Sequence, residues 1–89
     1  MKSMKTVEML QSTSVHGEIR PLRFRLSDNR IIIVKCIIKT VNENLAGNPM
    51  IVYEIEGAID ELVIRACVKF ESSTCKWYLL RLTRIGGAL

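Results

Sequence analysis

The side chains that could carry chemistry are few and widely spaced. The single histidine, His16, lies in a polar stretch beside Gly17, and Glu18 is the only acid close to it. General acid-base catalysis needs a partner held at hydrogen-bond distance, so a solvated turn is the preferred interpretation of His16. No Gly-x-Ser-x-Gly turn and no glycine-rich loop before a helix occurs. The sequence therefore predicts no catalytic residues and no enzyme activity.

The three cysteines, Cys36, Cys67 and Cys75, do not have the spacing of a metal site. No Cys-x-x-Cys pair occurs and no histidine adjoins a cysteine. Cys36 falls on the core face of its predicted strand, Cys67 on an outer face and Cys75 in a turn. We therefore expect neither metal nor cofactor, and the odd number of thiols favours a reducing, cytosolic compartment.

Acidic side chains gather around residues 54–61, but a solvated hairpin explains them better than a cation site. Basic side chains are a stronger indication of a binding surface than the acidic ones. Residues 19–41 carry a net charge of +5 and residues 42–62 a net charge of −5, within a chain of net charge +4. Alternating signs suit strands of one segment lying beside strands of the next.

The elements that must position these residues are predicted to be strands. Residues 31–41, IIIVKCIIKTV, are rich in β-branched side chains, and we expect a central strand with much of both faces covered. Residues 62–70 form the cleanest amphipathic strand: the inner residues are expected to be Leu62, Ile64, Ala66, Val68 and Phe70, and the outer residues Val63, Arg65, Cys67 and Lys69. Further strands are expected at residues 18–26, 50–56 and 76–82. Residues 5–10 fit a strand or a helical turn, and we prefer the strand.

The connections between these strands are short. Turns are expected at residues 11–17, 57–61 and 71–75, and the longest loop at residues 42–49. The sequence predicts a single all-β domain, 1–89, with residues 1–4 and 86–89 frayed. Its architecture is an antiparallel meander of five to six strands forming a small barrel or half-barrel. The sequence does not decide whether the sheet closes into a barrel.

The hairpin around residues 27–30 has a register that can be argued from charge. A loop with an odd number of residues pairs Phe24 with Ile32 and Leu22 with Val34, which separates the bases from the better apolar face. That core face is expected to hold Leu22, Phe24, Leu26, Ile32, Val34, Cys36 and Ile38. We therefore predict a three- or five-residue loop, or a bulge.

The opposite face is the candidate interaction face. It is expected to comprise Arg23, Arg25, Ile31, Ile33, Lys35, Ile37, Lys39, Arg65 and Lys69. Exposed isoleucines mark association, which favours a homo-oligomer or a protein partner. The bases suit a nucleic-acid-binding small barrel as the alternative, although Phe24 and Phe70 are expected inside and Glu54 and Glu56 can neutralise bases on adjacent strands.

One pattern resembles a known group of proteins. The spacing Gly17-x-Ile19-x-Pro21-x-x-Phe24, followed by an Ile/Val strand, a Tyr-containing strand and Lys76-Trp77-Tyr78-Leu79, resembles small bacterial all-β domains of unknown function. The resemblance implies a bacterial cytosolic protein and supplies no activity. No apolar run approaches the ~18 residues that span a membrane, so no membrane contact is expected. The predicted function is a small binding or structural module that self-associates and has no catalytic activity.

Overall fold

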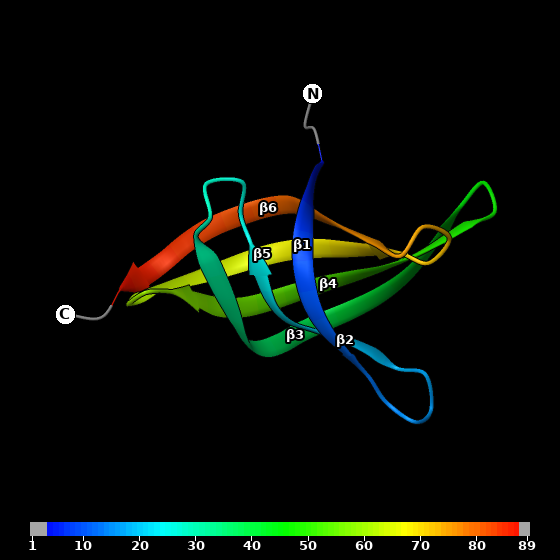
Figure 1. Ribbon diagram of the computed structural model, residues 1–89, viewed down its shortest axis with the longest axis horizontal. Helices are drawn as coiled ribbons and strands as arrows, with labels where there is room; N and C mark the ends of the chain where they lie inside the picture. The colour runs from blue at the N-terminus through cyan, green and yellow to red at the C-terminus, as the bar shows by residue number, and fades with distance from the viewer. Residues whose placement is uncertain (1–3, 88–89) are drawn as a thin grey trace.

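The computed structural model describes residues 4–87, which form six antiparallel β-strands (Figure 1). They are β1 (Lys5–Thr13), β2 (Ile19–Arg25), β3 (Ile31–Leu45), β4 (Asn48–Ile59), β5 (Leu62–Glu71) and β6 (Lys76–Gly87). The predicted all-β antiparallel meander is confirmed, and the first segment is a strand rather than a helical turn. The described residues contain no helix, and hence none long and apolar enough to cross a membrane.

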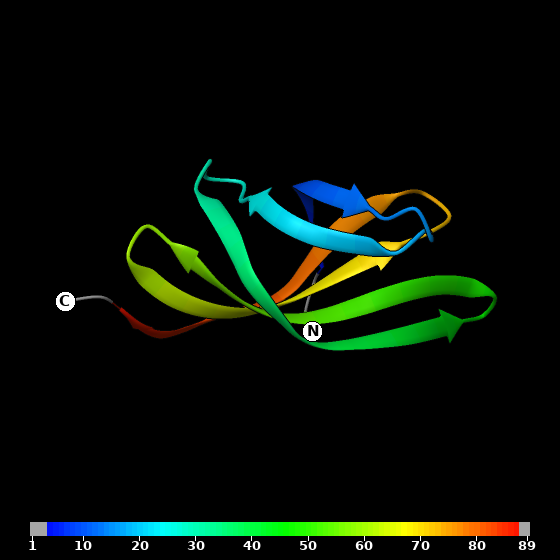
Figure 2. The same cartoon turned by 90° about the horizontal axis from the view of Figure 1, so that it is seen from below.

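The six strands follow one another around a closed ring, in which β6 also pairs with β1. The ladders differ greatly in length. β4 and β5 pair over ten residue pairs, from Met50–Glu71 to Ile59–Leu62, whereas β2–β3 and β1–β6 pair over three each. As a result the β1–β2 hairpin lies across the longer β3–β6 sheet and is joined to it by two short ladders (Figure 2).

The core lies on the inner face of the ring, where alternate residues of each strand point. Of the residues of β5 expected inside, Ile64, Ala66, Val68 and Phe70 are buried, and Tyr53 and Ile55 of β4 are buried beside them. The indole of Trp77 stacks at a tilt against Phe70 and Tyr53, with ring centroids 5.0 and 5.5 Å away. Three of the few aromatic residues therefore pack together within the core, which also holds Phe24.

The β2–β3 hairpin has the register that charge segregation predicts. Phe24 pairs with Ile32, and both side chains are buried. The amide N–H of Leu26 donates to the carbonyl of Arg30 at 2.8 Å, which leaves three residues in the loop, and Asn29 adopts a positive φ of 71°. Asparagine tolerates this left-handed conformation at little cost. The prediction of a loop with an odd residue count is confirmed.

Bulges overturn that face assignment from Cys36 onward, whereas Leu26 and Val34 pack against the core as predicted. The β3–β4 register shifts between Val34 and Cys36 and again between Ile37 and Lys39. Each extra residue exchanges the faces of the residues that follow it. Cys36 and Ile38, predicted to be core, are exposed, while Ile37, predicted to face outward, packs against the core. The expectation that both faces of this strand are covered was also wrong.

A third bulge changes β2. The β1–β2 register shifts so that Leu10 pairs with Arg23 but Gln11 pairs with Pro21, which leaves Leu22 without an opposite residue. Leu22 is exposed and Pro21 is buried, the reverse of the predicted alternation. The predicted pairing of Leu22 with Val34 is also absent, because the β2–β3 ladder ends at Arg23–Ile33.

The turns are tighter than predicted. The loop expected at residues 42–49 is wrong, because β3 continues to Leu45 and reverses through Ala46 and Gly47. Both turn residues have positive φ, 52° and 80°, as a type I′ hairpin turn requires. The turn expected at residues 57–61 is limited to Asp60–Glu61. The turn expected at residues 11–17 begins later, because β1 extends through Thr13. The turn at residues 71–75 occupies residues 72–75, between β5 and β6.

The ends of the chain were expected to fray. Residues 1–3 and 88–89 lie outside the described residues. Met4 precedes β1, and residues 86–87 belong to the end of β6.

Candidate interaction face

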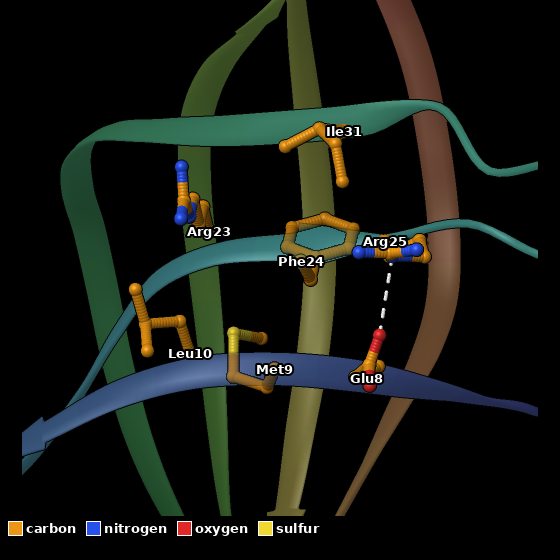
Figure 3. A pocket seen from close by; sticks show the side chains of 7 residues that line it. All are labelled: Glu8, Met9, Leu10, Arg23, Phe24, Arg25 and Ile31. Atoms are coloured by element: carbon orange, nitrogen blue, oxygen red, sulfur yellow. Dashed lines mark ion pairs between the residues drawn. The ribbon is translucent and has the colours of Figure 1, made fainter.

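The outer sides of β1, β2 and β3 form one continuous surface around two arginines. Cross-strand pairing places Arg23 between Leu10 and Ile33, and Arg25 between Glu8 and Ile31. We call this surface of six residues, Glu8, Leu10, Arg23, Arg25, Ile31 and Ile33, the β1–β3 face. Figure 3 shows most of these side chains and the strands that carry them.

A shallow hollow of about 280 Å³ lies on this face. Met9 and Phe24 contribute to its lining, although the ring of Phe24 is buried and belongs to the core. Leu10, Ile31 and Ile33 are all exposed large apolar residues. The face therefore offers apolar contact area around two guanidinium groups, a composition that is common where proteins meet.

The charges on the face are only partly compensated. Arg25 lies 3.1 Å from the carboxylate of Glu8, and both side chains are largely exposed (Figure 3). A surface pair of this kind contributes about 0–1 kcal/mol and is easily exchanged. Within residues 4–87, Arg23 forms no ion pair. The face therefore carries net positive charge available to an external anion.

The three other predicted residues of β3 are placed differently. Lys35 is exposed at the first bulge, and Lys39 is exposed opposite Glu54 on β4. Ile37 faces the interior because of the bulge that precedes it. The predicted apolar patch thus loses Ile37 and gains Leu10 of β1.

The two predicted bases of β5 do not join the β1–β3 face. In the ring, β3 and β4 separate β2 from β5. Arg65 lies 3.6 Å from Glu56, and Lys69, only 8% exposed, lies 3.1 Å from Glu43. The predicted patch of six bases is therefore divided, and its β5 part is neutralised by acids on neighbouring strands.

Glu54 is neutralised as well, by a base that was not among the predicted residues. Arg81 of β6 donates to both carboxylate oxygens of Glu54 at 2.8 and 2.9 Å. This two-pronged contact raises the pKa of Arg81 above its usual range. The contact of Glu56 with Arg65 of β5 agrees with the prediction that these acids neutralise bases on adjacent strands, whereas the base that pairs with Glu54 lies on β6, which is not adjacent to β4.

Aromatic side chains are not available on the β1–β3 face. Phe24, Tyr53, Phe70 and Trp77 are buried, and Tyr78 is half-buried with its hydroxyl donating to Glu71 at 3.1 Å. Single-stranded nucleic acids are held on small barrels largely by base stacking on exposed aromatic rings. The face lacks that platform.

The remaining chemically active side chains are dispersed. His16 is exposed in the turn between β1 and β2, where its backbone N–H donates to the hydroxyl of Ser14. Cys36 and Cys75 are exposed and Cys67 is buried. Burial, and then the nearby Glu54 carboxylate, raise the pKa of the Cys67 thiol. Residues 4–87 contain no group of three side chains that could hold a metal ion.

Sequence reasoning missed Glu8 and Leu10 on this face. The alternation of residues 5–10 was visible in the sequence. The residues of β2 that lie opposite them depend on the bulge at Leu22, and the amino-acid composition does not reveal that bulge. A comparison of the chain with models of protein families, with curated proteins and with solved structures finds no match. The resemblance to small bacterial domains therefore stays a prediction.

Proposed function

We propose that the chain is a non-catalytic binding module, and that its β1–β3 face contacts an acidic protein surface. The observation that carries the proposal is the position of Arg23. This guanidinium forms no ion pair among the described residues, and Arg23 lies between the exposed residues Leu10 and Ile33. A carboxylate placed against it gains a charge-assisted hydrogen bond while apolar side chains beside it bury Leu10 and Ile33.

The proposal can be tested with defined acidic probes. We suggest fluorescence anisotropy titration of the full chain against a labelled peptide of alternating glutamate and valine, at low and high NaCl. The peptide should bind at low salt and more weakly at high salt, because exposed charges are screened. Polyglutamate of equal charge should bind less tightly, since it cannot bury Leu10 and Ile33.

Variants locate the contact. Replacing both arginines, Arg23→Gln with Arg25→Gln, should weaken peptide binding about tenfold through the loss of two charged contacts. Arg84→Gln is the matched control, because Arg84 is an exposed arginine of β6 outside the face. Absence of peptide binding at low salt, or an equal loss in the control, would contradict the proposal.

The nucleic-acid alternative rests on the same uncompensated bases. A labelled oligo-dT strand in the same titration tests it, because contacts with phosphates must strengthen as salt is lowered. Tighter binding of oligo-dT than of the Glu-Val peptide would favour this alternative. The buried state of the aromatic rings favours the peptide.

Self-association remains part of the proposed function, as do the cytosolic location and the bacterial origin expected from the sequence. Packing the β1–β3 faces of two copies together would oppose the arginines of one copy to those of the other. Like charges brought together in an interface cost several kcal/mol by general estimate. A second copy is therefore better accommodated at a different surface.

A further inference from the structure

The long strand β3 has a free edge. Residues 31–33 pair with β2, but from residue 34 to residue 45 the described chain gives β3 only one neighbour, β4. No backbone hydrogen bond of the turns and loops of residues 4–87 reaches this stretch. In this part of the molecule β3 is the edge strand of the β3–β6 sheet (Figure 1). Alternate N–H and C=O groups along the edge therefore have no backbone partner within the described residues, which makes the edge a template for another strand.

The side chains along this edge are also unusual. Ile38, Val41 and Leu45 are 49%, 39% and 61% exposed. Lys39 and Glu43 flank Val41 at equal distances, two residues on either side. Lys39, Val41 and Glu43 pair with Glu54, Val52 and Met50 without a further register shift. The three residues therefore share the outer face of β3.

We propose that a second copy of this chain pairs antiparallel with β3 along this edge, with Val41 on the two-fold axis. In that register Val41 meets the partner's Val41. Lys39 lies opposite the partner's Glu43, and by symmetry Glu43 lies opposite the partner's Lys39. On the inner face Thr40 meets the partner's Asn42. Charged, apolar and polar residues are therefore each matched with their complement.

Neighbouring registers do not have this property. A shift of the axis to Asn42 places Val41 opposite the partner's Glu43, and a shift to Lys39 places two lysines together. Only pairing about Val41 joins Lys39 to Glu43 within the part of β3 that pairs regularly with β4. The edge is thus complementary to a second copy of itself, which is the property that an isologous dimer requires.

The charges needed for the pairing are available. Lys39 forms no ion pair within residues 4–87. Glu43 is half-buried, and its Oε1 atom lies 3.1 Å from Nζ of Lys69. Its second oxygen can accept from the partner's Lys39, so that one carboxylate joins a lysine of its own chain to a lysine of the other. This interface uses no residue of the β1–β3 face.

A cysteine on the two-fold axis gives the sharpest test. In a background with Cys36→Ser and Cys75→Ser, Val41→Cys should form an intermolecular disulfide under mild oxidation. Directly opposed residues of antiparallel strands have a Cα separation that a disulfide spans. Leu45→Cys is the matched control, because in this register the two copies of residue 45 lie about 26 Å apart. We expect about tenfold more covalent dimer for Val41→Cys than for the control.

Charge reversal tests the same register without a cross-link. Lys39→Glu opposes two pairs of glutamates and should raise the dimer dissociation constant, measured by light scattering over a dilution series, about tenfold. Lys35→Glu, an exposed change at the bulge outside the paired segment, should leave the constant unchanged.

A chain that stays monomeric at millimolar concentration would overturn this inference, as would cross-linking of Leu45→Cys equal to that of Val41→Cys. A dimer that dissociates on Ile33→Ser but not on Lys39→Glu would also overturn it, by assigning self-association to the β1–β3 face. These outcomes are separate from the acidic-peptide titration, which tests the proposed function by itself.

Discussion

At the scale of single residues, Glu71 connects three parts of the chain at one end of the sheet. Its carboxylate accepts hydrogen bonds from Thr74 Oγ1 at 2.6 Å, Asn48 Nδ2 at 2.7 Å and the Tyr78 hydroxyl at 3.1 Å. The hydrogen bond from Thr74, followed by that from Asn48, lowers the pKa of Glu71 from its ordinary value of 4.5. The β5–β6 turn and the starts of β4 and β6 are therefore held by one ionised group.

A dependence on pH follows from that lowered pKa. The folded state favours ionised Glu71, so its contribution to stability is present above pH 4.5 and is lost as the pH falls through the lower folded pKa. Glu71→Gln should lower the urea midpoint at pH 7 and reduce the fall in stability below pH 4.5. Glu18→Gln, an exposed glutamate in a turn, is the control. An unchanged pH profile for Glu71→Gln would contradict this assignment.

At the scale of elements, the shape of β3 depends on two bulges and one glycine. Gly57 of β4 lies opposite Val34, next to the first bulge. A Cβ atom at Gly57 would lie 2.5 Å from the carbonyl oxygen of Ile33, a distance that backbone atoms cannot accommodate without movement. The absent side chain therefore permits the close approach of β3 and β4 where β3 leaves β2.

Gly57→Ala should consequently destabilise the fold by about 1–3 kcal/mol, the usual range for overpacking. Gly86→Ala is the control, because a Cβ at Gly86 meets no atom within 4 Å in the described structure. Urea unfolding of the two variants, with equal m-values, measures the difference. Equal midpoints would show that the backbone at Gly57 yields without cost.

The bulges also mark the limit of prediction from sequence. The register of Phe24 against Ile32 was predictable, because a single shift would have mixed arginines into the core. The bulge before Ile37 was not, since Ile37 and Ile38 are the same residue type and either could face inward. Residues 42–45 of β3 looked like a loop because, with most of their side chains exposed, they lack apolar alternation. The two-residue turn Ala46–Gly47 was not predicted, because the asparagines on both sides of it made the whole stretch look like a loop.

The candidate site was predictable only where its residues lie on the two strands of one hairpin. Arg23, Arg25, Ile31 and Ile33 form part of one surface, as expected, because adjacent strands of a hairpin carry them. Arg65 and Lys69 belong to a strand that is not a neighbour of β2, and strand order in a ring cannot be derived from alternation within each strand.

At the scale of the whole molecule, the ring is held unevenly. The β1–β2 hairpin is joined to the rest by two ladders of three pairs and by two side-chain hydrogen bonds. The Trp77 Nε1–H donates to Gln11 at 2.7 Å, and the Tyr53 hydroxyl donates to the carbonyl of Ile19. β5 is paired along both of its edges over most of its length. Local opening is easiest where few backbone and apolar contacts must be broken.

Hydrogen exchange measured by NMR should therefore show faster exchange for amides of β1 and β2 than for those of β5. Gln11→Ala should accelerate exchange in β1 further and leave β5 unchanged, because it removes a contact with Trp77 but none within the β4–β6 sheet. Ser12→Ala, at the next position of β1, is the control. Equal protection of β1 and β5 would contradict this division of the molecule.

The order of strands around the ring also bears on how the chain can assemble. Five of the six pairings join strands that are consecutive in sequence, and only β1–β6 joins residues 5–7 to residues 77–79. Each of the five needs only a short loop to be closed, which costs little entropy and can occur early. The hairpins can therefore be added one after another as an open meander. Among the strand pairings of residues 4–87, the one that closes the ring, β1–β6, is the one that must wait for both ends of the chain.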